Sequence, residues 1–181
     1  MSALLNSFTQ ILLHRQGPED LPASRWLLRM VFVSYCAVGL VAMVVAGIFR
    51  ANPVAAILEV ALDVSLLCLW YWGLLSYAGL RNRLGQVLTA ALGCGTLLGL
   101  MFLPVFALTL TVQPADPGLP ATPWQLIAAF LYLSLLFWTA SVIGHITARA
   151  LDLGYMTGLG LGVLFVVTEL ALISALFPIA G

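Results

Sequence analysis

Apolar residues fill five long stretches of the chain, and polar residues gather mostly in the short segments between them. A run of about 20 apolar residues is long enough to cross the hydrocarbon core of a bilayer as an α-helix. Turn-forming residues separate the stretches, most clearly in segment 113–120, where three prolines prevent a helix from continuing. The predicted membrane spans cover residues 26–49, 54–80, 85–112, 123–148 and 154–177.

Residues 2–13 carry a shorter helical pattern, in which apolar side chains follow one stripe and polar ones lie mostly elsewhere. The apolar members are Leu4, Leu5, Phe8, Ile11 and Leu12. The pattern predicts an amphipathic helix lying at the membrane interface, with a frayed tail as the alternative. We therefore divide the chain into a cytoplasmic N-terminal segment, 1–23, and a transmembrane domain of five helices, 24–181.

Composition supports this all-α, polytopic membrane fold. Hydrophobic residues make up 62% of the 181 residues and charged residues 8%, whereas a soluble domain has roughly a quarter of its residues charged. Too few polar side chains remain to cover a soluble core of this size. The net charge is zero, which argues against nucleic acid as a partner. Cys36, Cys68 and Cys94 lie in apolar runs, and none has a second cysteine or a histidine at the spacing of metal ligands. We therefore predict packing roles for them and no metal site.

The arginines predict the orientation in the membrane. With the N-terminus in the cytoplasm, the cytoplasmic segments hold six arginines and the opposite segments hold only Arg50. Positive residues in short loops favour the cytoplasmic side, so we predict a cytoplasmic N-terminus and a periplasmic C-terminus. The six are Arg15, Arg25, Arg29, Arg81, Arg83 and Arg149.

Small residues recur at four-residue spacing in the third, fourth and fifth spans. Such stripes let helix backbones approach closely, which favours helix association in lipid. We favour packing inside one bundle over a seam between two copies of the chain. The candidate packing glycines are Gly95, Gly99, Gly144, Gly154, Gly158 and Gly162.

Three acidic residues lie inside predicted spans, where a charge costs at least ~2.5 kcal/mol at the helix centre. Glu59 and Asp63 are four residues apart and share one helix face. Counting from the span centres places Asp63 and Glu169 at similar depth, roughly 5 Å outward from the midplane. The two acids are therefore predicted to face each other and to share a proton, bind a cation or line a polar pocket.

A structural role is the alternative for these acids. A protonated carboxyl group would then bond to a hydroxyl group of a neighbouring helix, and Glu59 would pair with Arg50 near the membrane surface. The candidate hydroxyl partners are Ser65, Ser134, Thr139 and Thr168.

A second candidate group lies at the predicted cytoplasmic side, where His145 and Arg149 are joined by Arg81 and Arg83. Arginine matches phosphate geometry, so this group could bind a phospholipid head group. Ordinary cytoplasmic charge with a hydrogen-bonded histidine is the favoured alternative. The other histidine, His14, is expected to lie too far out for a haem held by two histidines, and no cofactor is predicted.

No catalytic residue is predicted, because the chain lacks GxxxxGK[ST], HExxH and GxSxG motifs and an aspartate-rich cytoplasmic motif. These absences favour a protein that is not an enzyme.

The layout of a short head and five closely spaced spans resembles, at the level of topology, the small five-helix Yip1-like membrane proteins. Uncharacterised proteobacterial inner-membrane proteins are equally similar, and the stretch 15–24 (RQGPEDLPAS) looks like their N-terminal signature. The Asp-Leu-Tyr-Gly-Pro element of the eukaryotic Yip1 relatives is absent, so the resemblance implies no trafficking role and no functional residues. It implies a multi-pass protein of a bacterial inner membrane.

Three functional hypotheses follow from these patterns. The first is a non-enzymatic accessory or assembly subunit, with membrane lipids and other membrane proteins or a second copy of itself as partners. The second is a small transporter or channel-like protein with a proton or cation site at Asp63 and Glu169. The third, less favoured, is a lipid-modifying enzyme that uses the end of the bundle holding His145 and Arg149.

Overall fold

The computed structural model describes residues 2–112 and 121–177, and 86% of these residues are helical with no strand among them. The all-α prediction is therefore confirmed. The long helices are α2 (Arg25–Val45), α4 (Pro53–Tyr77), α5 (Leu84–Thr111), α6 (Pro123–Ala150) and α7 (Tyr155–Leu176). The short elements are α1 (Ser2–Leu12), η1 (Pro18–Asp20), α3 (Ile48–Ala51) and η2 (Arg81–Arg83).

The five long helices match the predicted spans to within a few residues, and each is long and apolar enough to cross a membrane. The first span ends earlier than predicted, at Val45 rather than near Phe49. Gly47 has φ 77°, a left-handed conformation that interrupts the helix before the short α3. The starts of the helices follow local signals: Ser24, Asn52 and Thr122 each accept a hydrogen bond from a backbone N–H of the first turn.

Few residues of the five helices are fully buried, and many large apolar side chains are exposed. In the most apolar stretch of each helix, at most 28% of the residues are buried inside the protein. Large apolar residues such as Phe130 and Phe137 are 70% and 67% exposed. An apolar surface this extensive is unstable in water and is what a lipid-facing surface requires. The chain is a multi-pass integral membrane protein.

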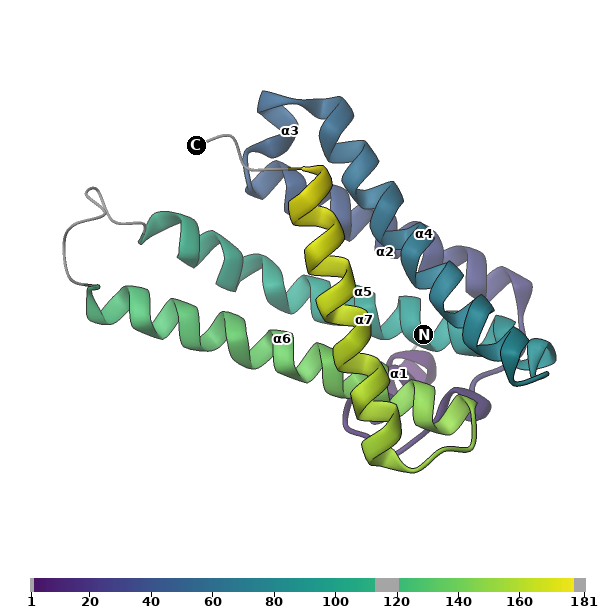
Figure 1. Cartoon of the computed structure of the whole chain (residues 1–181). Coiled ribbons are helices and arrows are strands. Elements are labelled where there is room, and N and C mark those ends of the chain that lie inside the picture. The colour runs from purple at the N-terminus through teal and green to yellow at the C-terminus, as the bar shows by residue number, and fades with distance from the viewer. Residues whose placement is uncertain (1, 113–120, 178–181) are drawn as a thin grey trace.

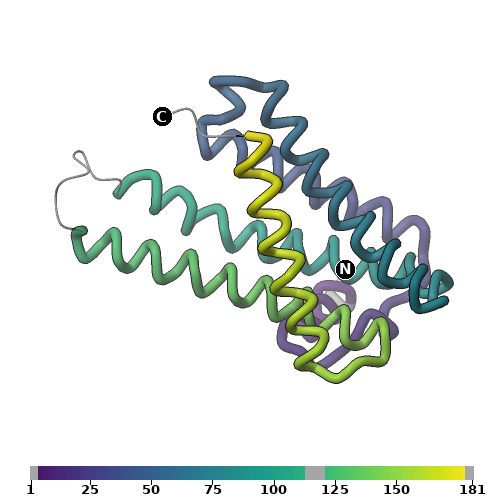
Figure 2. The backbone as a smooth tube through the Cα atoms, viewed as in Figure 1, coloured from purple at the N-terminus to yellow at the C-terminus, as the bar shows by residue number. Residues whose placement is uncertain are grey.

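Two ends of the bundle can be distinguished (Figure 1). We call one the arginine end, because it holds Arg15, Arg81, Arg83 and Arg149, together with α1 and η1. We call the other the distal end, where α2 leads through α3 into α4. In Figures 1 and 2, α5 and α6 run away from α2 and α4 toward their distal ends, while α7 crosses between the two pairs.

Close packing of α6 on α7 depends on glycine. A Cβ atom added to Gly144, Gly158 or Gly162 would overlap the backbone of the facing helix, so no larger residue fits there. The predicted stripe is wrong for Gly154, which precedes α7 and where an added Cβ would meet no atom within 4 Å.

The glycines of α5 act differently. A Cβ on Gly95 would overlap the ring of Tyr35, and a Cβ on Gly99 would lie 2.8 Å from the side chain of Val38. These two glycines thus make room for side chains of α2 instead of allowing two backbones to meet. Gly95 and Gly99 therefore contact side chains, whereas the glycines of α6 and α7 contact backbone.

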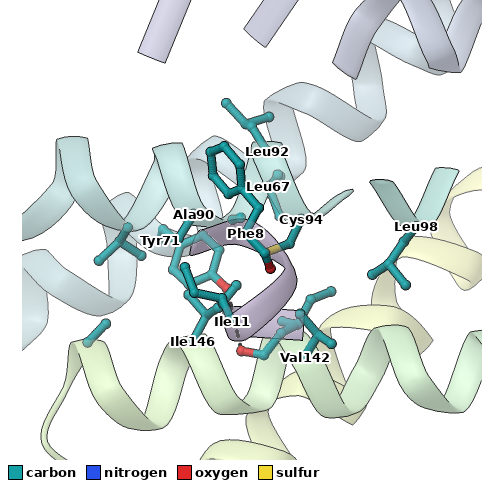
Figure 3. Packing of buried hydrophobic residues seen from close by; sticks show 14 of the residues in the cluster. Phe8, Ile11, Leu67, Tyr71, Ala90, Leu92, Cys94, Leu98, Val142 and Ile146 are labelled. Atoms are coloured by element: carbon teal, nitrogen blue, oxygen red, sulfur yellow. Dashed lines mark hydrogen bonds between the residues drawn. The ribbon is translucent and has the colours of Figure 1, made fainter. Parts of the chain in front are cut away.

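Helix α1 lies among the long helices at the arginine end (Figure 3). Phe8 and Leu12 are almost fully buried, and Ile11 is 0% exposed. The Phe8 ring occupies the space beside Gly93, and the Phe8 carbonyl accepts a hydrogen bond from the Cys94 thiol at 3.7 Å. The apolar stripe predicted for α1 therefore packs on protein. The placement of α1 relative to the membrane interface stays a prediction.

Candidate intramembrane carboxyl site

Two cavities lie within the bundle and share part of their lining. The larger has a volume of about 390 Å³, is partly open, and lies among α2, α4, α5, α6 and α7. The smaller has a volume of about 200 Å³ and extends from the shared residues toward the side chains that pack on α1. The residues common to both are Tyr35, Gly95, Gly99, Phe102 and Glu169.

Asp63 and Glu169 meet in this region. Their carboxyl groups approach close enough for a hydrogen bond between them, although they come from helices α4 and α7. Tyr35 of α2 donates a further hydrogen bond from its hydroxyl group to Asp63 Oδ1 at 3.1 Å. The two acids and Tyr35 thus link helices α2, α4 and α7 through one polar cluster.

Tyr35 is the member of this cluster that the sequence analysis missed. Its ring fits over Gly95, so the small residue on α5 and the phenol on α2 form one structural unit. A signal was present in the sequence: Tyr35 lies in the middle of its span, whereas aromatic residues of a membrane helix gather near the interfaces. A phenol within the bundle needs a hydrogen-bond partner, and Asp63 supplies it.

Glu59 lines the larger cavity one helical turn from Asp63. The ion pair expected between Glu59 and Arg50 is not among the salt bridges found in the described part of the chain. Its carboxyl group instead lies close enough to Asp63 for the two charges to repel each other.

The hydroxyl partners proposed for the acids have other roles. Ser134, Thr139 and Thr168 each donate to the backbone carbonyl four residues earlier in their own helix. This is a common way to satisfy a hydroxyl group inside a membrane helix. The hydroxyl groups of these three residues therefore bond to backbone carbonyls, and not to an acid as predicted.

The chemistry of the site follows from its composition. Two carboxylates are acceptors only, so a hydrogen bond between them requires a proton on one of them. Among the described residues that line either cavity, none is an arginine, lysine or histidine. A proton or an external cation must therefore balance the negative charge in this region of low dielectric constant.

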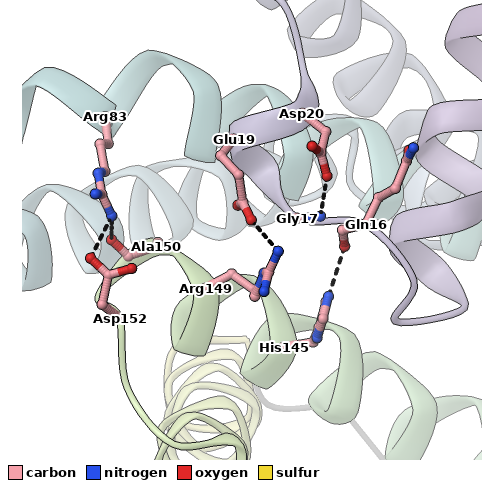
Figure 4. A network of polar contacts seen from close by, with 9 residues as sticks. All are labelled: Gln16, Gly17, Glu19, Asp20, Arg83, His145, Arg149, Ala150 and Asp152. Carbon is pink, nitrogen blue, oxygen red and sulfur yellow. Dashed lines mark hydrogen bonds and ion pairs between the residues drawn. The ribbon is translucent and has the colours of Figure 1, made fainter.

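The polar group at the arginine end is arranged in a different way (Figure 4). Arg83 pairs with Asp152 at 2.9 Å and also donates to the Ala150 carbonyl, and Arg149 pairs with Glu19. His145 lies close by, with Nε2 2.8 Å from the carbonyl oxygen of Gln16. A cavity of about 290 Å³ lies beside these ion pairs.

The structure brings together three of the four residues predicted to bind a lipid head group. Arg83 and Arg149 line the same cavity, and His145 lies one turn from Arg149. Arg81 is directed elsewhere: it donates to the Ser76 hydroxyl group and its guanidinium group lies 5.6 Å from the Trp72 ring centroid. Because Arg83 and Arg149 each have an acidic partner, the cavity has little free positive charge to attract a phosphate group.

His14 was expected to lie too far out to share a site with His145, but the structure places the two rings in contact. Their ring centroids are 4.7 Å apart in an edge-to-face arrangement, because the turn after α1 folds back onto α6. His14 Nε2 lies 3.0 Å from the Ser141 hydroxyl group, which in turn lies 3.0 Å from that of Tyr155. No group of three or more metal-binding side chains was found among the described residues.

Comparisons of the chain with protein-family models, with curated proteins and with solved structures found no match. Functional conclusions therefore rest on the geometry of the chain itself.

Proposed function

We propose that the chain is a small membrane transport protein in which Asp63 and Glu169 bind a proton or a cation. The observation that carries this proposal is the close approach of these two carboxyl groups in the lining of the larger cavity. Transport across a bilayer needs a polar site at membrane depth that small species can reach, and acidic residues in such a place are typical of proton relays. We further propose that the arginine end faces the cytoplasm of a bacterial inner membrane.

The alternative is a non-enzymatic accessory or assembly subunit of a membrane complex. Small-residue stripes supported this hypothesis, because they could form contacts with another chain. In the structure, Gly144, Gly158 and Gly162 contact each other within one chain, so they no longer argue for an external partner. A lipid-modifying enzyme at the arginine end has weaker support, since Arg83 and Arg149 are already paired with acids.

Infrared spectroscopy of the protein in lipid nanodiscs tests the proposal directly. We expect a protonated-carboxyl band that shifts in D2O and disappears as the pH is raised. The band should be lost in the double variant Asp63→Asn/Glu169→Gln and should remain in Glu59→Gln, which alters the same cavity outside the hydrogen-bonded pair. A wild-type band that responds to neither D2O nor pH would overturn the proposal, because the pair would then be a sealed structural contact.

Proteoliposomes that enclose a pH-sensitive dye extend the test to transport. A gradient of Na⁺, K⁺ or an organic monovalent cation should move protons in the wild type and not in Asp63→Asn. Proton movement that is the same in the wild type, the variant and empty liposomes for every cation would count against a transport role.

A further inference from the structure

We propose that the larger cavity binds a monovalent organic cation with an aromatic or alkyl body, in exchange for a proton on the Asp63–Glu169 pair. This inference rests on the proposed function and names the class of its substrate. It is carried by the size, the lining and the charge of the cavity.

The size and lining of the cavity favour an organic molecule. A volume of about 390 Å³ lies within the range of small-molecule sites, about 300–1,000 Å³. Apart from three acids and two tyrosines, the lining consists of apolar side chains and glycines, including Val38, Leu103 and Ile173. A bare metal ion needs several oxygen ligands and would leave most of this apolar surface without a partner.

The charge of the lining selects a cation. Glu59, Asp63 and Glu169 all line the cavity, and none of the described lining residues is basic. An anion would meet these carboxyl groups without any compensating charge. A neutral apolar molecule would leave the hydrogen-bonded acids unused, whereas a cation meets both the acids and the apolar wall.

Aromatic rings supply a second point of recognition. Phe102 and Tyr132 meet edge to face with centroids 5.7 Å apart, and Tyr35 and Phe106 line the same space. The face of an aromatic ring attracts an organic cation, most strongly where water is excluded. Carboxyl groups and aromatic rings in the lining of one cavity therefore fit a quaternary ammonium head with an apolar substituent.

Proton exchange keeps the site neutral. With both carboxyl groups protonated the pair has no charge, and with one proton lost it carries one negative charge. A monovalent cation that binds the second form restores neutrality, so one proton leaves for each cation bound. The titratable groups that face the pair contribute no positive charge; they are Tyr35 and Cys36 of α2, Glu59 and Cys68 of α4, Cys94 of α5 and Tyr132 of α6.

The test compares three matched probes in binding to the purified full-length chain in nanodiscs. Benzyltriethylammonium carries the positive charge, its carbon analogue is neutral and of the same shape, and benzenesulfonate is an aromatic anion. We expect the cation to bind about tenfold or more tightly than the neutral analogue, with no binding of the anion. In weakly buffered solution at a pH where the infrared band is present, we expect release of up to one proton per cation.

Two further variants test the role of the cavity without changing the acids, so the test does not depend on whether the acids are needed for folding. Ala42→Phe fills the cavity and leaves all three acids in place, so it should weaken cation binding about tenfold while the infrared band remains. Ala61→Phe, on the exposed side of α4, is the matched control and should bind as the wild type does.

Equal affinity for the cation and the neutral analogue, or an Ala42→Phe variant that binds like Ala61→Phe, would overturn the substrate class. Cation binding without proton release at any pH would overturn the exchange. If Na⁺ or K⁺ moves protons in proteoliposomes and the organic cation does not, this inference fails while the proposed function stands.

Discussion

The arginine end and the distal half of the bundle are built from similar apolar helices but packed in opposite ways. At the arginine end, α1 fills the space between α4, α5 and α6, and polar side chains bond to backbone carbonyls around it. In the distal half, α5 and α6 diverge from α2 and α4 (Figure 1). The larger cavity lies among these helices. At the arginine end α1 fills the apolar core and a cavity lies beside the ion pairs, whereas in the distal half the larger cavity lies among the helices beside three acids.

This difference suggests that one region mainly stabilises the protein and the other mainly binds a ligand. A filled end with backbone-to-backbone contacts resists change, because interiors tolerate neither voids nor extra atoms. A cavity beside acidic groups has a cost in stability, which is commonly the case at functional sites. Substitutions at the arginine end should therefore mainly change stability, and substitutions around the cavity should mainly change binding.

The largest effect is expected where α6 meets α7. Gly158→Leu places a side chain against the backbone of Gly144, where neither helix can move aside, so we expect a loss of about 3 kcal/mol or more in the free energy of unfolding. Thermal unfolding in detergent and the yield of monodisperse protein measure it.

Gly160→Leu is the matched control, because an added Cβ there meets no atom within 4 Å. Leucine favours a helix more than glycine does, so equal losses in the two variants would mean that the contact with α6 does not explain the effect.

The next effect concerns α1. Ile11→Ala removes a side chain that is 0% exposed, and we expect a loss of about 3 kcal/mol from the cavity that it leaves. Leu5→Ala on the same helix is the control, since Leu5 is 52% exposed. If the two variants lost the same stability, α1 would not be packed inside the bundle in solution, and the contrast between the two ends would disappear.

The sequence was sufficient to predict the spans, because a bilayer imposes a length and a composition that a single segment shows by itself. The pairing of Asp63 with Glu169 was also predictable, since two acids at one depth inside the membrane have few alternatives. Tyr35 was not predicted, because its role depends on which face of α2 meets Gly95, and that is a tertiary choice. The position of His14 depends in the same way on a chain reversal after α1, which no local pattern specifies.

A smaller effect is expected at the carboxyl site. Tyr35→Phe removes the hydrogen bond to Asp63 and keeps the ring over Gly95, so we expect a loss of about 1 kcal/mol in the free energy of unfolding. Tyr77→Phe is the control, because Tyr77 is 97% exposed. Tyr35→Phe should also change the pH dependence of the infrared carboxyl band. An unchanged titration would mean that Tyr35 does not influence the protonation of the pair.

The smallest effect is expected for the ion pair between Glu19 and Arg149, which ties η1 to the end of α6. Both side chains are about half exposed, at 47% and 53%, so water and salt screen their attraction. A double-mutant cycle with Glu19→Gln and Arg149→Gln should give a coupling energy of about 0.2–1 kcal/mol, which falls as ionic strength is raised. Coupling well above 1 kcal/mol that persists in high salt would show that the arginine end is held by charge. The expected weak coupling assigns its stability to the apolar packing of Phe8, Ile11 and Leu12, and leaves the Asp63–Glu169 pair as the place where charge matters most.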